Sequence, residues 1–189
     1  MIRTLVLMLA LAAASPALAQ SAAAPAPAAT PAPPPADPKD VSSDQRIVLA
    51  VYETISGPAG PRDWNRLRSL MAPGARFIVT SPNPDGGMRT RVLTTEDYIG
   101  RAGPLMLKEG FYEHGVIGQG SSFSHISSIA SPYESRHAMG EKPFARGINH
   151  FELVSDGKRW WIATISWEAE SPTNPLPAWA DKALLPGLD

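Results

Sequence analysis

Four polar side chains in the second half of the chain could carry chemistry at one pocket: Glu113, His125, Tyr133 and Asn149. A carboxylate that is desolvated against aromatic walls has a raised pKa and can serve as a general acid or base. We therefore expect Glu113 and His125 as the candidate catalytic residues. Tyr133 or Asn149 would supply the hydrogen-bond donor.

Two of these residues also have structural alternatives. A buried amide left unpaired costs about 1–3 kcal/mol, so Asn149 must meet backbone, water or a ligand. A hydrogen bond that fixes a loop or a neighbouring strand would satisfy it equally. Glu113 could pair with an arginine of the domain instead of acting in a pocket.

Alternation along the strands predicts which side chains face the pocket, because successive side chains of a strand point to opposite faces. The inward sets are Trp161, Ala163, Ile165 and Trp167; Gly147, Asn149, Phe151 and Leu153; and the odd positions from Phe123 to Tyr133. The expected ligand-binding residues are Tyr133, Asn149, Phe151, Trp161 and Trp167. Arg146, His150 and Glu152 then lie on the outer face, with Ile148, Trp160 and Ile162. A β-bulge would invert these assignments beyond the bulge.

The elements that must position these residues are helices first and long strands afterwards. Capping-box patterns at Ser42-x-x-Gln45 and Thr94-x-x-Asp97, and a start at Asp63, predict three helices, which end near Gly57, Pro73 and Gly103. Strands are expected over 76–80, 88–93, 111–119, 122–137, 144–155 and 159–170. Asp156-Gly157 predicts a tight hairpin turn of the primed type between the last two.

The last four of these strands are longer than the usual ~5–6 residues. Long antiparallel strands twist and curl, and helices laid on the concave side of a curled sheet enclose a pocket. We therefore expect an α+β fold in which a cone-like, curled antiparallel sheet carries three N-terminal helices on its concave face.

Five segments resemble the nuclear transport factor 2-like (NTF2-like, or SnoaL-like) superfamily, in an exported bacterial branch. They begin at Trp64 (WNRLRSL), Gly110 (GFYE), Tyr133 (YESR), Arg146 (RGIN) and Asp156 (DGKRWWI). The resemblance covers roughly residues 43–170. It implies a cystatin-like α+β cone with a pocket and no particular reaction, because the superfamily contains isomerases, dehydratases, cyclases, transport factors and dimerising domains.

The N-terminus has the pattern of a secretory signal peptide. Arg3 precedes an apolar run over 5–14, and Ala17-Leu18-Ala19 predicts cleavage before Gln20. We expect residues 1–19 to be the signal peptide and 20–40 a disordered linker rich in proline and alanine. The NTF2-like domain would follow over 41–170 and a proline-rich tail over 171–189. The mature protein would be periplasmic or secreted, with no membrane insertion after cleavage.

Composition excludes several classes of site. The chain of 189 residues has no cysteine, so disulfides, thiolate zinc sites and cysteine nucleophiles are ruled out. It carries 17 Lys+Arg against 18 Asp+Glu, which does not suit a nucleic-acid binder. No metal-ligand or phosphate-binding motif is present, so we expect no metal and no cofactor.

The favoured function is an apolar pocket that binds a small hydrophobic or aromatic molecule. The first alternative is a cofactor-independent isomerase or dehydratase type of enzyme that uses a pocket acid and base. The second is a structural or interaction module that forms a homodimer through the outer sheet face.

Overall fold

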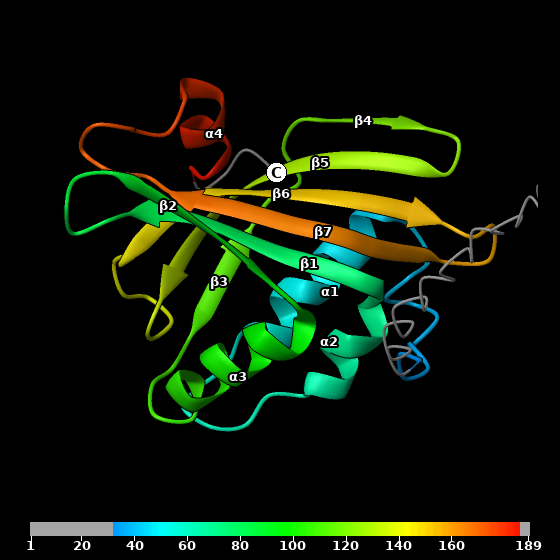
Figure 1. Ribbon diagram of the computed structural model, residues 1–189. Helices are drawn as coiled ribbons and strands as arrows, with labels where there is room; N and C mark the ends of the chain where they lie inside the picture. Colours follow the sequence, from blue (N-terminus) through cyan, green and yellow to red (C-terminus); the bar gives the residue numbers. More distant parts are fainter. Residues whose placement is uncertain (1–31, 186–189) are drawn as a thin grey trace, which may run out of the picture.

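The computed structural model describes residues 32–185 and consists of a curled sheet with helices on both sides (Figure 1). The helices are α1 (Asp44–Ile55), α2 (Trp64–Leu70), α3 (Thr95–Met106) and α4 (Ala178–Ala183). The strands are β1 (Met71–Pro82), β2 (Met88–Leu93), β3 (Tyr112–Gly115), β4 (Gly120–Phe123), β5 (Ile126–Arg136), β6 (Ala145–Ser155) and β7 (Trp160–Ala169). The predicted α+β fold is confirmed.

The sheet has the order β2-β1-β7-β6-β5-β3, and β4 pairs with β5 outside this path. All pairs are antiparallel except β1 with β7, which is parallel. The expected all-antiparallel sheet is therefore mixed at this one pair. Strands β1 and β7 are not joined by a hairpin. Between them the chain crosses to β3 at the opposite edge of the sheet and returns through β5 and β6, so β7 runs parallel to β1.

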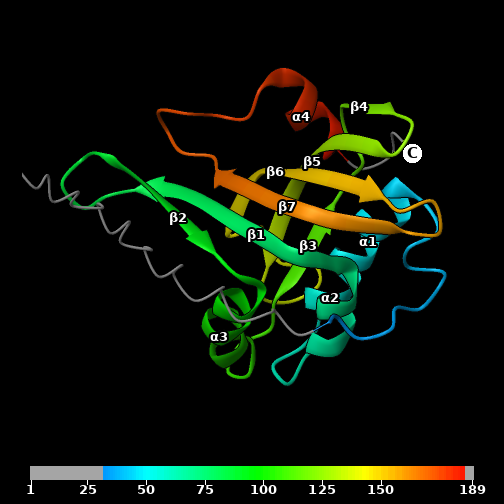
Figure 2. The same ribbon diagram turned by 45° about the vertical axis from the view of Figure 1, so that its right-hand side comes forward.

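The three N-terminal helices lie on one side of the sheet and α4 lies on the other, as the two views agree (Figures 1 and 2). Their capping residues explain where they begin. Asp63 and Thr94 cap α2 and α3 as expected, but the cap of α1 is Ser43 rather than Ser42. Helix α3 also continues past Gly103 to Met106, with Pro104 inside its last turn.

The core lies between α1, α2 and the concave face of the sheet. Its fully buried side chains come from both layers and include Ile47, Leu67, Leu70, Phe151, Leu153 and Ile162. Burial of such apolar side chains contributes about 1.5–3 kcal/mol each relative to exposure. The core thus fixes α1 and α2 against the sheet and leaves the concave side next to α3 open.

A cluster of four charged side chains holds the start of the domain to α1 and α2. The carboxylate of Asp40 accepts from Arg66 at 2.7 and 2.9 Å and from Arg46 at 3.0 Å. Glu53 accepts from the same two arginines. Asp40, which the sequence analysis places at the end of the linker, is therefore buried and paired.

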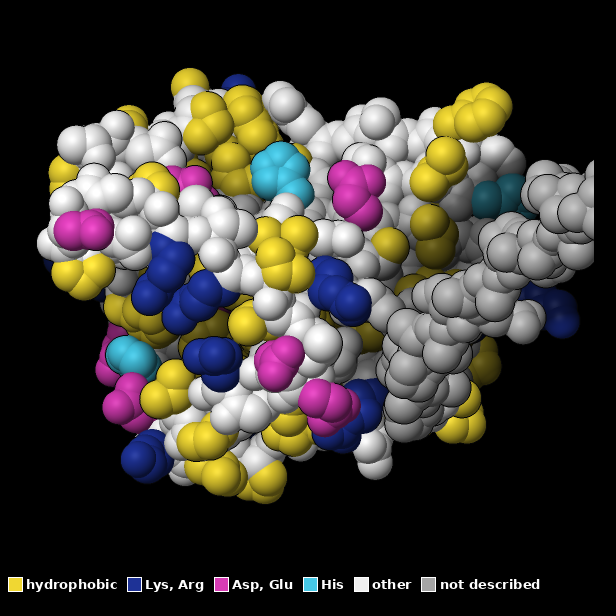
Figure 3. Space-filling model, in the orientation of Figure 1, with side chains coloured by type: hydrophobic (Ala, Val, Ile, Leu, Met, Phe, Trp, Pro, Cys, Tyr) yellow, Lys and Arg dark blue, Asp and Glu magenta, His cyan; other side chains and the backbone are white. Residues whose placement is uncertain are grey.

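The described surface is mixed in charge. Figure 3 shows basic and acidic side chains on the same face with apolar side chains between them. Within residues 32–185, no helix has both the length and the hydropathy needed to cross a membrane.

Candidate functional site

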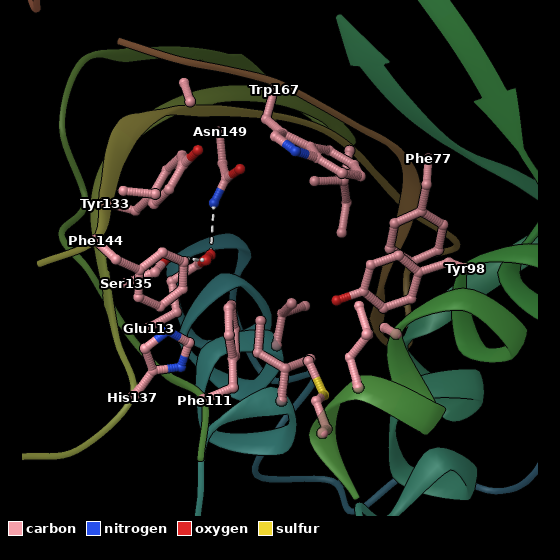
Figure 4. A pocket seen from close by; sticks show the side chains of 18 of the residues that line it. Phe77, Tyr98, Phe111, Glu113, Tyr133, Ser135, His137, Phe144, Asn149 and Trp167 are labelled. Atoms are coloured by element: carbon pink, nitrogen blue, oxygen red, sulfur yellow. Dashed lines mark hydrogen bonds between the residues drawn. The ribbon is translucent and has the colours of Figure 1, made fainter. Parts of the chain in front are cut away.

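A cavity of about 470 Å³ lies between α3 and the concave face of the sheet. Helices α1 and α3 and strands β1, β3, β5, β6 and β7 all contribute to its lining, which is mainly apolar. Its aromatic members are Phe77, Tyr98, Phe111, Tyr133, Phe144, Phe151 and Trp167. All of them except Phe151 are labelled in Figure 4. The long curled strands form one wall, and α3 closes the opposite side.

Glu113 places a carboxyl group at one end of this cavity. Its Oε2 accepts from the Ser135 hydroxyl at 2.8 Å, and its Oε1 accepts from Asn149 Nδ2 at 3.1 Å. Burial among apolar side chains raises its pKa to about 7, although the two hydrogen bonds act in the opposite direction. No ion pair within residues 32–185 involves Glu113, so the arginine pairing considered from the sequence is absent there.

Asn149 is the link between Glu113 and a second group of hydroxyls. Its Nδ2 also donates to Tyr52 Oη at 3.1 Å. Tyr52 in turn lies 2.7 Å from Ser131 Oγ, which donates to the carbonyl of Val116 at 2.7 Å. Both amide protons of Asn149 are thus used inside the protein, which satisfies the donor side of this buried amide.

Several polar atoms of the cavity have no hydrogen-bond partner among the described residues. They are Asn149 Oδ1 and the hydroxyls of Tyr98 and Tyr133. Figure 4 shows the Tyr98 hydroxyl directed into the open space opposite Asn149. Burial, followed by the nearby Glu113 charge, raises the pKa of both tyrosines, so they are neutral donors at physiological pH.

One opening of the cavity is lined by His137, Phe144 and Glu109. The His137 ring stacks on Phe144 with 4.3 Å between ring centroids. Its Nδ1 lies 3.1 Å from the carbonyl of Gly110 and 3.7 Å from Glu109 Oε2. These side chains are exposed, so the opening faces solvent.

Five of the predicted site residues do line the cavity: Glu113, Tyr133, Asn149, Phe151 and Trp167. Phe151 also packs edge-on against Tyr52, with 6.1 Å between ring centroids. Their roles in catalysis or ligand binding stay predictions.

His125 does not reach the cavity, and its predicted place there is wrong. The expected strand over 122–137 is broken by a two-residue turn at Ser124 and His125, which joins β4 to β5. Ser124 has φ 53° there, in the left-handed region. His125 is exposed, and its Nδ1 lies 2.8 Å from Ser124 Oγ.

Trp161 also lies outside the cavity, contrary to the prediction. The register between β6 and β7 shifts at Leu153, which pairs with Ile162, whereas Glu152 pairs with Thr164. This β-bulge reverses the alternation in the first part of β7. Trp161 Nε1 donates to Asp156 Oδ2 at 2.9 Å, and the Arg159 guanidinium lies 3.6 Å from the ring.

Because of the same bulge, the set of residues on the outer face of the sheet differs from the predicted one. Ile162 is fully buried in the core and Trp160 packs against the core, so neither forms part of the outer surface. His150 and Glu152 are exposed as expected. Helix α4 contacts β5 on this side, and Arg146 pairs with Asp181. The homodimer stays a prediction, with α4 now covering part of its face.

Four residues that line the cavity were not predicted from the sequence: Phe77, Tyr98, Ser135 and His137. The buried hydroxyl of Tyr52, which bonds to Asn149 beside the cavity, was not predicted either. Ser135 could have been predicted, because it lies two residues after Tyr133 in the same strand and therefore points to the same inward face. Tyr98 and Phe77 stack on each other at 4.4 Å between helix α3 and strand β1, a contact that no local pattern reveals.

No three His, Asp or Glu side chains within the described part of the chain are grouped as metal ligands would be. The turn predicted at Asp156-Gly157 exists, but the loop between β6 and β7 spans four residues rather than two.

Comparisons with known proteins identify similar folds. No family profile and no curated protein matches the sequence. Among solved structures, a Caulobacter vibrioides protein with a cystatin-like fold covers 70% of this chain and 90% of its own, at 10% identity and a TM-score of 0.49. An NTF2-like protein from Cytophaga hutchinsonii covers 68% of this chain and 100% of its own, at 15% identity and a TM-score of 0.48. At this level of similarity they carry no information about ligand or reaction.

Proposed function

We propose that this protein is an exported NTF2-like domain whose cavity binds a small, mainly hydrophobic or aromatic molecule. One observation carries the proposal: a cavity of about 470 Å³ has aromatic walls and a hydrogen-bonded carboxyl group at one end. Ligand sites are commonly ~300–1,000 Å³, mostly apolar, with a few placed polar groups.

The polar groups support the proposal because their arrangement favours one orientation of a ligand. Asn149 Oδ1 and the hydroxyls of Tyr98 and Tyr133 keep free hydrogen-bonding capacity, while the rest of the lining offers dispersion contacts. A rigid apolar molecule with one polar end would use both. If the polar end of the ligand lay elsewhere in the cavity, without a hydrogen-bond partner, the binding free energy would be less favourable by about 1–3 kcal/mol.

The test is a binding screen with a cavity-filling variant. Native mass spectrometry and thermal shift with apolar alcohols, ketones and aromatic metabolites should give saturable binding. Ala102→Phe, on the cavity side of α3, should abolish the binding. Ala178→Phe, on the exposed start of α4, is the matched control and should retain it. Equal binding by both variants would contradict the proposal.

A second candidate, a cofactor-independent isomerase or dehydratase type of enzyme, is favoured by the pKa of Glu113. A general base works best when its pKa lies near the operating pH, and Glu113 has a pKa of about 7. Tyr98, Tyr133 or Asn149 could orient the reacting group. His125 plays no part in this version, because it lies outside the cavity.

Proton exchange at carbon distinguishes the two candidates. An enzyme of this kind should catalyse deuterium exchange next to the carbonyl of a bound ketone in D₂O. Glu113→Gln should slow the exchange by about 10²-fold or more. Ketones that bind without exchange would leave binding as the function.

Export rests on residues 1–19, which lie outside the described residues, and stays a prediction. Its test is the mass of the protein recovered from the periplasm or medium of its host. A mature chain that begins at Gln20 is the expected result, and an uncleaved chain would contradict it.

A further inference from the structure

The carboxyl group of Glu113 has neutral partners within the protein. Its two side-chain hydrogen bonds come from Ser135 and Asn149, both uncharged. A desolvated carboxylate is normally paired with a cation or a metal. The described residues supply neither to Glu113, although other acidic residues of the domain, such as Asp40, have arginine partners.

The groups that face Glu113 from the surrounding elements do not supply a positive charge. Tyr52 from α1, Tyr98 from α3 and Tyr133 from β5 all have raised pKa values and are neutral donors. At the opening, His137 lies beside Glu109, and both are solvent-exposed. The enclosed part of the cavity therefore has one potential negative charge and no positive one among these residues.

Aromatic rings surround the approach to this carboxyl. Phe111 precedes it by two residues on the same side of the chain, and Tyr133 and Phe144 lie next to it in Figure 4. The negative faces of aromatic rings attract an ammonium group. A carboxylate beside such rings therefore favours a cation over a neutral polar group.

We propose that the cavity selects an apolar molecule with a single amino group, which binds as an ammonium ion to the carboxylate of Glu113. This inference rests on the proposed function and names its ligand class. The ammonium would donate to Glu113 and to Asn149 Oδ1, which are adjacent acceptors. The apolar part would lie between Trp167, Tyr98 and Phe77.

The pH dependence of affinity follows from the ionisation of Glu113, whose pKa is about 7 in the free protein. An alkylamine has a pKa of about 10, so it is protonated throughout the neutral pH range. Its affinity should therefore rise about tenfold per pH unit up to neutrality and level off above. A neutral alcohol should show no such rise, and a carboxylic acid should bind more weakly as the pH increases.

The experiment measures calorimetric affinity for phenylbutylamine, phenylbutanol and phenylbutanoate at several pH values between about 5.5 and 8. At the upper pH the amine should bind at least tenfold more tightly than the alcohol. Glu113→Gln should remove this preference. Glu152→Gln, on the exposed outer face of the sheet, is the matched control and should keep it.

The wild-type pH profile keeps the inference testable even if Glu113→Gln folds poorly. Equal affinities for amine and alcohol, or an amine affinity that does not rise with pH, would overturn the amine selectivity and leave the proposed function standing. Failure of all three probes to bind would count against both.

Discussion

Asn149 and Glu113 are joined by a hydrogen bond of 3.1 Å, although β6 and β3 are not neighbours in the sheet. Strand β5 lies between them and contributes Ser135, which bonds the other oxygen of Glu113. The curl of the sheet brings these three strands around one carboxyl. The position of Glu113 therefore depends on the curvature that the long strands create.

Asn149→Ala should raise the pKa of Glu113 above its value of about 7, because the hydrogen bond that favours the charged form is lost. The free energy of unfolding should fall by about 1–3 kcal/mol, since Tyr52 also loses a donor. Carboxyl ¹³C NMR titration and urea unfolding measure the two effects. Asn174→Ala, at an exposed hydrogen bond to Glu168, should change neither. An unchanged Glu113 pKa would refute the role of Asn149.

Glu113 should make the protein less stable as the pH rises from about 4.5 to about 7. Burial raises the pKa of Glu113 in the folded protein from its usual 4.5 to about 7, so the folded state binds more protons than the unfolded state in this window. A shift of 2.5 pH units corresponds to about 3 kcal/mol of lost stability above pH 7. Urea unfolding across this range should show a flatter pH dependence for Glu113→Gln. Glu109→Gln should keep the wild-type profile, and a wild-type slope in Glu113→Gln would contradict the assignment.

Gly115→Ala should destabilise the domain, because an added Cβ would lie 2.1 Å from Cζ of the Tyr52 ring. Overpacking of this kind usually costs about 1–3 kcal/mol. Gly100→Ala is the matched control, since its Cβ would meet nothing within 4 Å and alanine favours a helix by about 1 kcal/mol over glycine. In thermal unfolding, Gly115→Ala should have a lower Tm than the wild type and Gly100→Ala a higher one. Equal shifts would show that the Tyr52 contact does not limit position 115.

Arg66→Ala should lower the free energy of unfolding by about 2 kcal/mol, because buried Asp40 loses its bidentate partner. The exposed Arg68–Glu96 pair is the control, and Arg68→Ala should cost under about 1 kcal/mol. Hydrogen bonds from Arg66 lower the pKa of Asp40 below 3.8, so this stabilisation is present above that pH and is lost as the pH falls through the folded pKa. Urea unfolding at neutral pH and at about pH 3 measures both effects. If Arg66→Ala and Arg68→Ala lost similar amounts of unfolding free energy at neutral pH, the cluster around Asp40 would not stabilise the domain more than an exposed ion pair does.

Trp167 and Trp161 should respond differently to ligand. Trp167 lines the cavity, whereas Trp161 lies against Arg159 and Asp156 outside it. An apolar ligand should therefore change the indole fluorescence of Trp161→Phe as it does in the wild type. Most of that change should be lost in Trp167→Phe. Retention of the full signal in Trp167→Phe would place the ligand elsewhere.

Much of the fold follows from local patterns. Asp63 and Thr94 predict two helix starts, and the strand patterns predict a curled sheet. Parity along β6 places Asn149 and Phe151 correctly, because the side-chain period of a strand is 2 and that strand is regular over these residues.

Alternation along a strand predicts the wrong side-chain direction where the strand is interrupted. His125 lies in a turn at which Ser124 adopts a positive φ, and serine is not a typical residue for such a position. Trp161 lies beyond the register shift between β6 and β7, and such a shift is a property of the pairing of two strands that alternation along β7 alone does not reveal. The partners of Glu113 depend on three strands meeting, so only its inward direction was predictable.

A crystal structure of the protein with bound phenylbutylamine tests the central claim most directly. The account predicts electron density inside the cavity, with the aromatic ring near Trp167 and the nitrogen within hydrogen-bond distance of a Glu113 carboxyl oxygen. Density only on the outer surface, or a cavity filled by its own side chains, would contradict it.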